Sequence, residues 1–459
     1  MKFKLASIRG GIVAPRGFSA TGVFCDIKRL GTGKGSDKGQ KRDLALIVSE
    51  TPATVAGLFT TNQVCAAPVK VCLQRVKNHK AQAIVVNSGN ANACTGRSGL
   101  QDALAMVRFT EQTLNLPAGS ALVGSTGRIG VTLPMDNVRA GIIEAAVELG
   151  SAPDYADRAA EAILTSDTRA KQIAVEFENA GQKIRIGGMC KGAGMIQPGM
   201  SATGARPAAN PLHATMLCFL TTDAAVEARA LQNALNEAVA NSFNRITVDG
   251  DMSTNDTVLI LANGLAAADS PKSKVQSPKS MDAHASRIKD QDYPGFDIFQ
   301  AALNHVCVEL AKMIVKDGEG VSRFVTVRVE GAKTPTDADA AARAVANSAL
   351  VKTSWHGGDP NWGRIIDALG YSPATVVEEK VDIGYSAPGS SKVLWSLKRG
   401  QPTSASFKAL CAAVAPREFD LHIRLNLGPA GALIYAADLT EEYVAFNKGD
   451  VSDPGSLGG

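Results

Sequence analysis

The segment around Thr215 contains a pattern that could carry out nucleophilic chemistry. Thr215 follows the small residue Ala214 and opens the apolar run TMLCFLTT, which is typical of a buried strand. A threonine hydroxyl is a weak nucleophile until a base removes its proton, and an α-amine on the same residue can be that base. Cleavage of the bond between Ala214 and Thr215 would create this amine. An ordinary β-branched strand residue fits the same pattern, so the segment alone leaves both interpretations open.

A second candidate lies in the segment GSTGRIG at 124–130. The sequence predicts that Thr126 and Gly127 follow a strand in a tight turn. Such a turn can direct a hydroxyl and a backbone N–H toward one point, as an oxyanion hole requires. A simple turn that ends a strand is the alternative interpretation.

Two charged residues stand in glycine-rich surroundings. Lys191 opens the segment KGAGM, and glycine lets a backbone approach a ligand closely. Glu319 lies between Gly318 and Gly320, at the predicted end of a helix. A cation and a carboxylate could bind a zwitterionic amino acid, whereas solvated surface charge is the alternative for both residues.

The segment KGAGMIQP (191–198), followed by ATML (214–217), resembles the nucleophile region of the ornithine acetyltransferase family, also called the bifunctional glutamate N-acetyltransferases. Further segments match this family in the same order. They are AGLFTTNQVCAAPV (56–69), VVNSGNANACTG (85–96), GSTGRIG, ILTSDT (163–168), DGDMSTNDT (249–257), DGEGVSRF (317–324), NSALVKTSWHGGDPNWGRIIDALGYS (347–372) and EEYVAFN (441–447). The resemblance runs from about Gly17 to Ser452, which is nearly the whole chain.

The resemblance implies a self-processing enzyme of arginine biosynthesis with an N-terminal threonine nucleophile. The precursor would cut itself between Ala214 and Thr215 into an α chain (1–214) and a β chain (215–459). Thr215 Oγ would take the acetyl group from N-acetylornithine, and glutamate would then accept it. The residues that match the family's oxyanion hole are Thr126 and Gly127. Those that match its substrate-binding positions are Thr165, Lys191, Thr215, Glu319, Asn447 and Ser452.

No metal or organic cofactor is expected, because the acyl group would be bound covalently to the enzyme itself. Acetyl-CoA is left open as a second donor. The expected partners are the small-molecule substrates and the two chains of one precursor, assembled as two α and two β chains. Two other classes stay open: an amide hydrolase or aminopeptidase on the same scaffold, with water as acceptor, and a homologue that does not process itself. Lys191 and Glu319 argue against the hydrolase.

Bulk properties narrow the setting. A formal net charge of +4 without a basic run argues against nucleic acid as a partner. The eight cysteines form no C-x-x-C pair, so we expect free thiols in a reducing compartment rather than a zinc site. No apolar run is long enough for a signal peptide or a membrane helix, and the cytoplasm is therefore the expected location. An organellar matrix stays open as the alternative, for a chain from which a transit peptide has been removed.

The order of elements predicts an α+β fold. A hairpin is expected over 174–188, and amphipathic helices are expected elsewhere, one of them with Asp154 as its N-cap. Hairpins and paired helices favour layered α+β architecture over a doubly wound sheet, and the resemblance implies a sandwich of two β-sheets flanked by helices. Two polar segments with little to bury are expected to be mobile loops: the insert SATGARPAANPLH (201–213), which the family lacks, and the stretch 268–295.

Overall fold

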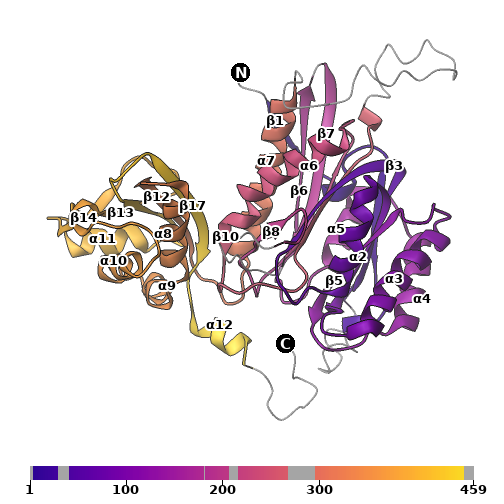
Figure 1. Ribbon diagram of the computed structural model, residues 1–459, viewed down its shortest axis with the longest axis horizontal. Helices are drawn as coiled ribbons and strands as arrows, with labels where there is room; N and C mark the ends of the chain where they lie inside the picture. The colour runs from indigo at the N-terminus through magenta and orange to yellow at the C-terminus, as the bar shows by residue number, and fades with distance from the viewer. Residues whose placement is uncertain (1–3, 29–40, 180, 206–215, 267–294, 449–459) are drawn as a thin grey trace.

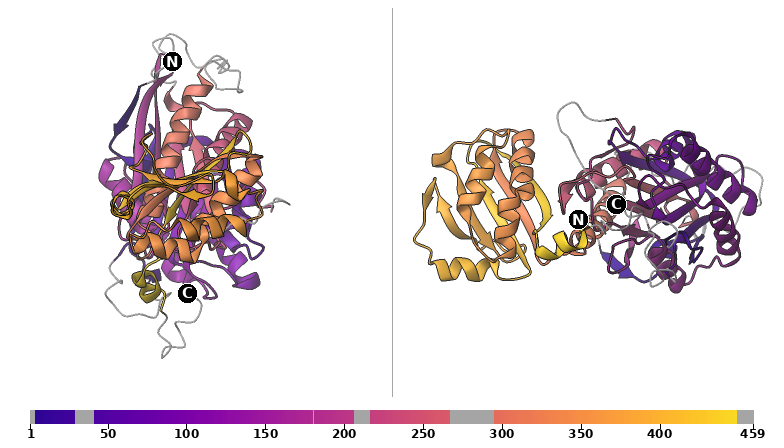
Figure 2. Two further views of the ribbon diagram at one scale, coloured as in Figure 1. Left: turned by 90° about the vertical axis from the view of Figure 1, so that its left-hand side faces the viewer. Right: turned by 90° about the horizontal axis from the view of Figure 1, so that it is seen from below.

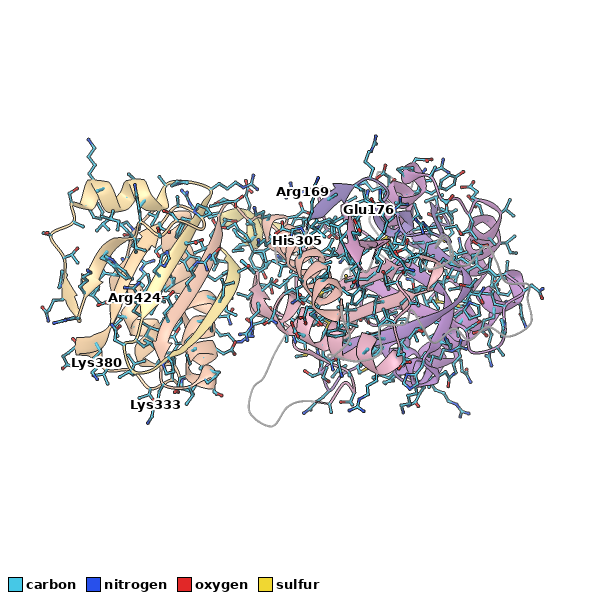
Figure 3. All side chains as sticks on the ribbon, turned by 90° about the horizontal axis from the view of Figure 1, so that it is seen from above. Arg169, Glu176, His305, Lys333, Lys380 and Arg424 are labelled. Carbon is cyan, nitrogen blue, oxygen red and sulfur yellow. The ribbon has the colours of Figure 1, made fainter. Side chains whose placement is uncertain are left out.

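The computed structural model describes residues 4–28, 41–179, 181–205, 216–266 and 295–448. These residues form two lobes, each built around one β-sheet with helices packed against it (Figure 1). The predicted α+β class, with two sheets flanked by helices, is confirmed. Charged side chains are distributed over both lobes, as the labelled Lys333 and Arg424 on one lobe and Arg169 and Glu176 on the other illustrate (Figure 3).

The larger sheet has the strand order β1-β6-β7-β9-β11-β3-β4-β5, with β2 and β8 paired to β3. Its strands are β1 (Leu5–Ile8), β2 (Phe18–Val23), β3 (Leu44–Thr60), β4 (Lys80–Asn90), β5 (Ala121–Arg128), β6 (Lys171–Asn179), β7 (Gln182–Lys191), β8 (Met200–Ser201), β9 (Leu217–Thr222) and β11 (Thr257–Ala262). The predicted hairpin is the antiparallel pair of β6 and β7. At the centre of the sheet, β9 runs parallel to β11 and antiparallel to β7.

Both faces of the larger sheet are covered by helices. One face carries α2 (Ala67–Arg75), α3 (Gly96–Thr113), α4 (Met135–Val147) and α5 (Pro153–Ala162), and the other carries α6 (Ala228–Ala240) and α7 (Phe296–Lys316). Along β9, Leu217 and Phe219 point into the first core, whereas Cys218 and Leu220 point into the second. Successive strand residues face opposite sides, so a strand covered on both faces must be apolar throughout.

Helix α7 passes the length and apolarity test for a membrane span, but it packs inside the protein. Its residues Phe299, Leu303 and Leu310 are fully buried in the core between α7, α6 and the sheet. A buried helix of a large core is apolar for this reason, and α7 is such a helix.

The smaller sheet has the order β10-β17-β12-β16-β13-β14-β15. Its strands are β10 (Ile246–Thr247), β12 (Phe324–Ala332), β13 (Asp382–Ser386), β14 (Leu394–Lys398), β15 (Gln401–Pro402), β16 (Glu418–Arg424) and β17 (Ala430–Ala437). One face is covered by α8 (Pro335–Asn347), α9 (Ala349–His356), α10 (Trp362–Gly370) and α11 (Phe407–Val414). The last helix, α12 (Glu441–Phe446), lies between this lobe and the lobe of the larger sheet (Figures 1 and 2).

Two local predictions need correction. Asp154 is not an N-cap: Ala152 caps α5, and Pro153 takes the first helical position, where its missing N–H costs nothing and its fixed φ suits a helix. The insert is not a loop from its first residue, because Ser201 pairs with Phe59 as the end of β8. Its residues 206–213, and all but Gly295 of the stretch 268–295, lie outside the described residues.

Candidate active site

Three of the predicted site residues meet at the end of β7. Lys191 closes that strand with only 3% of its surface exposed. Its Nζ donates to Thr165 Oγ1 at 2.7 Å and to Thr126 Oγ1 at 3.3 Å. Lys191 is therefore a buried cation in contact with two hydroxyl groups, and the surface-charge interpretation does not apply to it.

Thr126 and Gly127 belong to β5 itself, which corrects the expected turn after a strand. Both pair with the end of β4, Thr126 opposite Ser88 and Gly127 opposite Gly89. Gly127 has φ +129°, and a Cβ on it would lie 2.3 Å from the carbonyl carbon of Gly89. Only glycine fits this close approach of two strands, which brings the Thr126 hydroxyl to Lys191.

A buried carboxylate that the sequence did not single out supports Lys191. Asp167 accepts the Gly192 N–H at 2.7 Å, and its carboxylate lies 3.6 Å from Lys191 Nζ and 2.6 Å from Lys171 Nζ. Burial alone would raise the pKa of Asp167, but the charges of Lys191 and Lys171 outweigh it and hold that pKa well below its usual range. Asp167 is thus an ionised anchor for Lys191.

Asp317 extends this ionic cluster. Its carboxylate pairs with Lys171 Nζ and accepts the Thr168 backbone N–H at 3.1 Å. Burial lowers the pKa of Lys171, but Asp167 and Asp317 overcome this and raise it. Asp167 lies in the segment ILTSDT and Asp317 in DGEGVSRF, and both segments match the family. The motifs therefore pointed to the two carboxylates, whereas their partner Lys171 lies outside both segments.

A second contact joins Glu319 and Asn447. Asn447 Nδ2 donates to Glu319 Oε2 at 3.0 Å, and the Glu319 N–H donates to the carbonyl of Ala193 at 3.0 Å. Gly194 lies so close that a Cβ on it would come within 2.6 Å of the Glu319 carboxylate. The glycine-rich turn after Lys191 therefore packs against the Glu319 carboxylate, which the Asn447 amide also contacts.

Ala214, Thr215 and Ser452 lie outside the described residues, so their roles stay predictions. The strand that follows Thr215 is described, and Leu217 is the Cα partner of Lys191 on one side and of Thr257 on the other. The chain thus enters β9 directly beside the end of β7.

Within the described ranges, no group of three or more His, Cys, Asp or Glu side chains could hold a metal ion.

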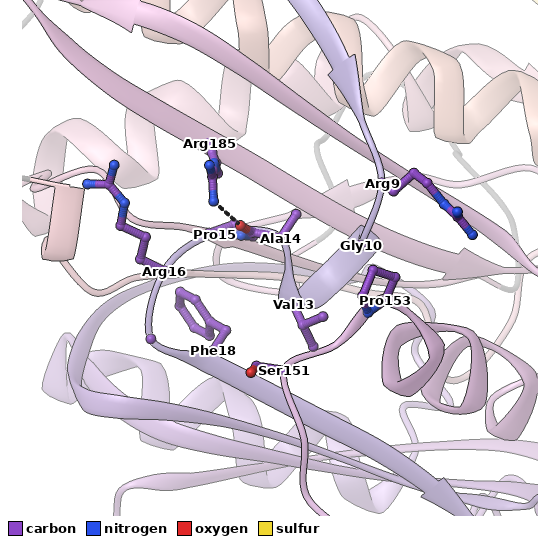
Figure 4. Close-up of a pocket in the computed structure, with 11 residues that line it drawn as sticks. Arg9, Gly10, Val13, Ala14, Pro15, Arg16, Phe18, Ser151, Pro153 and Arg185 are labelled. Atoms are coloured by element: carbon purple, nitrogen blue, oxygen red, sulfur yellow. Dashed lines mark hydrogen bonds between the residues drawn. The ribbon is translucent and has the colours of Figure 1, made fainter.

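A separate cavity of about 440 Å³ is lined by Arg9, Arg16 and Arg185, among others (Figure 4). Arg185 donates to the carbonyl of Ala14 at 3.3 Å, and the side chains of Arg9 and Arg16 point away from each other. The three cations do not converge on one point. This cavity borders the early part of β7, whereas Lys191 closes that strand.

Comparison with known proteins gives a consistent result. Residues 22–449 match the model of the ArgJ family. The chain is 43% identical over 440 residues to the arginine biosynthesis bifunctional protein ArgJ of Symbiobacterium thermophilum, covering 96% of this chain and 98% of that protein. It is 41% identical over 445 residues to the glutamate N-acetyltransferase of Methanocaldococcus jannaschii, covering 96% and 98%.

A solved ornithine acetyltransferase chain from Mycobacterium tuberculosis, complexed with ornithine, is 37% identical; the match covers 43% of this chain and 100% of that one, with a TM-score of 0.39. The family model spans nearly the whole chain, and full-length relatives exceed 40% identity. By these matches, the chain belongs to the ArgJ family.

Proposed function

We propose that this protein is an acetyltransferase of arginine biosynthesis that moves an acetyl group from N-acetylornithine to glutamate. The names of its relatives, arginine biosynthesis bifunctional protein and glutamate N-acetyltransferase, support this reaction. The observation that carries the proposal is the contact of Lys191 Nζ with Thr126 and Thr165, directly beside the strand that follows Thr215. This arrangement supports the proposal, because it gathers two hydroxyl groups and a cation beside the strand that follows Thr215.

The nucleophile would arise by self-cleavage between Ala214 and Thr215, which divides the precursor into chains 1–214 and 215–459. Cleavage frees the α-amine of Thr215, and this amine takes the hydroxyl proton as Oγ attacks. The new base and the nucleophile belong to the same residue, so their relative position is set by covalent structure.

In the first half-reaction, Thr215 Oγ forms a bond to the acetyl carbonyl carbon of N-acetylornithine. The carbonyl oxygen becomes negative, and the Thr126 hydroxyl and the Gly127 N–H stabilise that charge, with the Lys191 ammonium close to the Thr126 hydroxyl. The bond from carbon to the ornithine nitrogen then breaks, the nitrogen takes the proton from the amine, and ornithine leaves. The acetyl group remains as an ester on Thr215.

In the second half-reaction, the amine of glutamate attacks the ester, its proton passes to the α-amine of Thr215, and Thr215 Oγ recovers a proton as N-acetylglutamate leaves. Glu319, held by Asn447, would attract the ammonium group of the donor. Thr165 and Ser452 complete the proposed binding set. The proposal needs no cofactor, and it leaves acetyl-CoA open as a second donor. It includes a cytoplasmic location and an assembly of two α and two β chains.

The relatives' names favour acetyl transfer over the hydrolase alternative. A specific observation agrees: Lys191 and Glu319 are joined through one short turn, which suits capture of an amino acid rather than of water. The remaining alternative is a chain that does not process itself. The mass of the purified protein distinguishes it, because an uncut chain has the full-length mass.

The test measures ornithine release from N-acetylornithine with and without glutamate, together with intact mass. We expect two chains, an acetylated β chain with donor alone, and parallel double-reciprocal plots, because ornithine must leave before glutamate reacts. Thr215→Ala should stay as one uncut chain, whereas Thr222→Ser, at the far end of β9, should process normally. Intersecting plots without an acetylated chain would contradict the mechanism, and ornithine release independent of glutamate would indicate a hydrolase.

A further inference from the structure

The loop DGDMSTNDT (249–257) matches the family, but the reaction above gives it no role. Its first residue, Asp249, contacts the glycine-rich turn at the end of β7. Asp249 Oδ2 accepts the Met195 N–H at 2.7 Å, and Oδ1 accepts the Ile196 N–H at 2.8 Å. The backbone closes the same junction, because the Val248 N–H donates to the Ile196 carbonyl at 2.7 Å. The loop therefore fixes the turn through both side-chain and backbone contacts.

The turn needs this support at Met195. Met195 has φ +52°, the left-handed conformation that residues other than glycine rarely adopt. Its side chain is 41% exposed, so packing contributes little to holding the residue in this conformation. Burial raises the pKa of Asp249, but the N–H groups of Ile196 and Met195 act in the opposite direction because they bind the ionised carboxylate. Asp249 therefore stabilises a backbone conformation that the residue type at this position does not favour.

The conformation of the turn decides how Glu319 is supported. Gly194 lies so close to Glu319 that a Cβ on it would come within 2.6 Å of the carboxylate. The Glu319 N–H donates to the carbonyl of Ala193 at 3.0 Å. Ala193 and Gly194 directly precede Met195, so a shift of the turn would move the support of both the side chain and the backbone of Glu319.

Asp249 also reaches Glu319 through α12. Burial is the largest cause that raises the pKa of Tyr443 on this helix, and an interaction of its hydroxyl with the Asp249 carboxylate contributes to the same shift. The Tyr443 carbonyl accepts a hydrogen bond from Asn447 Nδ2 at 3.0 Å, and the same Nδ2 donates to Glu319 Oε2 at 3.0 Å. The amide that contacts Glu319 is therefore held by a residue with which Asp249 interacts.

We propose that Asp249 is a positioning residue for Glu319. It fixes the turn that packs against the Glu319 carboxylate and, through Tyr443, the helix whose Asn447 contacts the same carboxylate. This inference rests on the proposed function, in which Glu319 attracts the ammonium group of the donor, and deepens it by naming the residue that sets where that carboxylate lies. Asp249 thus acts on substrate binding without touching the substrate.

The test compares Asp249→Asn with Asp251→Asn, both as fully cut protein. Asp249→Asn preserves the shape of the side chain but replaces one acceptor oxygen with an NH₂ group, so one of the two N–H groups of the turn loses its acceptor. Asp251 is the matched control, because it lies two residues further along the same loop, is exposed, and loses the same charge. KM and kcat for N-acetylornithine are measured for both variants, alone and combined with Glu319→Gln.

Asp249→Asn should raise KM by about three- to tenfold and leave kcat within about twofold, because Glu319 keeps its charge and loses only its placement. Asp251→Asn should match the wild-type protein. Asp249→Asn combined with Glu319→Gln should have the KM of Glu319→Gln within about twofold, because a positioning residue has no effect once the carboxylate that it places is gone. A purely structural role for Asp249 would instead lower the melting temperature and give effects on KM that add.

Two further variants separate the two routes to Glu319. Glycine adopts a positive φ without strain, so adding Met195→Gly to Asp249→Asn should recover most of the loss in KM. Tyr443→Phe removes only the hydroxyl that interacts with Asp249, and it should raise KM by less than Asp249→Asn does. Amide hydrogen exchange over 192–197, followed by mass spectrometry, should become faster in Asp249→Asn and stay unchanged in Asp251→Asn.

Additive effects of Asp249→Asn and Glu319→Gln on KM would overturn the assignment, as would unchanged exchange over 192–197. A folded Asp249→Asn variant that stays uncut would also overturn it, because Asp249 would then serve cleavage rather than the placement of Glu319. If Asp249→Asn does not fold, Tyr443→Phe takes its place in the combination with Glu319→Gln, with the same expectation. Wild-type protein that is cut but transfers no acetyl group would refute the proposed function alone, since the exchange measurement does not depend on transfer.

Discussion

Asp167 holds Lys191 in two ways: its carboxylate lies 3.6 Å from Lys191 Nζ and accepts the N–H of Gly192, the residue directly after Lys191, at 2.7 Å. The side chain and the backbone of the turn are therefore fixed by one carboxylate. Because Lys191 is buried, its charge needs this compensation, and its orientation toward Thr126 depends on it.

Asp167→Asn should destabilise the protein by about 3–5 kcal/mol at pH 7, because it leaves Lys191 buried without its anion. The folded-state pKa of Asp167 lies below its unfolded value of about 3.9, so its stabilisation is full above that value and is lost as pH falls through the folded pKa. The gap in free energy of unfolding between variant and wild type should therefore narrow below about pH 4. Urea denaturation at pH 7 and pH 3 measures it. Asp154→Asn, an exposed residue on α5, should change stability by less than about 0.5 kcal/mol.

Gly127→Ala should abolish or severely reduce both cleavage and transfer, because its Cβ would lie 2.3 Å from the carbonyl carbon of Gly89. Gly130→Ala is the matched control in the same segment: Gly130 also has a positive φ, +81°, but nothing lies within 4 Å of its Cβ. Gly130→Ala should lower the free energy of unfolding by only about 1 kcal/mol, the cost of a side chain at positive φ, and should retain activity. Band patterns on a denaturing gel and ornithine release compare the two. Equal activities would mean that β4 and β5 tolerate separation at this point.

Thr126→Ala should lower kcat by roughly a hundredfold or more, since one of two proposed oxyanion donors is lost while the Gly127 N–H remains. Thr126→Ser keeps the hydroxyl that Lys191 contacts at 3.3 Å and should recover most of the rate. The rates must be measured on fully cut protein, because the same donors could serve cleavage. An unchanged kcat in cut Thr126→Ala would exclude Thr126 from the oxyanion hole.

Glu319→Gln should raise KM for N-acetylornithine by roughly ten- to a hundredfold, because a charged hydrogen bond is worth about 1.5–3 kcal/mol. Gln keeps an oxygen for the contact with Asn447 Nδ2, so the fold around α12 should survive. Glu330→Gln, whose carboxylate pairs with Arg424 on the exposed side of the C-terminal lobe, should leave KM unchanged. A fall in kcat alone would place Glu319 in the chemical step rather than in binding.

Local patterns in the sequence predicted local structure well. The hairpin predicted over 174–188 is present as the antiparallel pair of β6 and β7. The apolar run after Thr215 became a strand covered on both faces. Asp154 failed as a cap because Pro153 competed for the start of the same helix and fits its first position better.

The contacts between distant segments could not be read from the chain. Motif resemblance selected Thr126, Thr165 and Lys191, and they do meet, but nothing in their spacing indicates a common point. Asp167 and Lys171 are four residues apart in the sequence. Their part in one ionic cluster is evident only in the structure, where Lys191 at the end of β7 lies beside Asp167. A single sequence shows which side chains can ionise, whereas the burial that makes a pair strong depends on the assembled sheet.

The strand order of the larger sheet has a consequence for how the two proposed chains stay together. β9 and β11, on the C-terminal side of the proposed cut, lie between β7 and β3, on its N-terminal side. The cut therefore leaves two polypeptides interleaved in one sheet, and neither can complete that sheet alone. Synthesis as one chain makes folding a first-order event, whereas refolding of the denatured, cut protein becomes second-order and slows on dilution. Maturation would thus make folding hard to reverse: an enzyme that unfolds after the cut can no longer refold as a single chain.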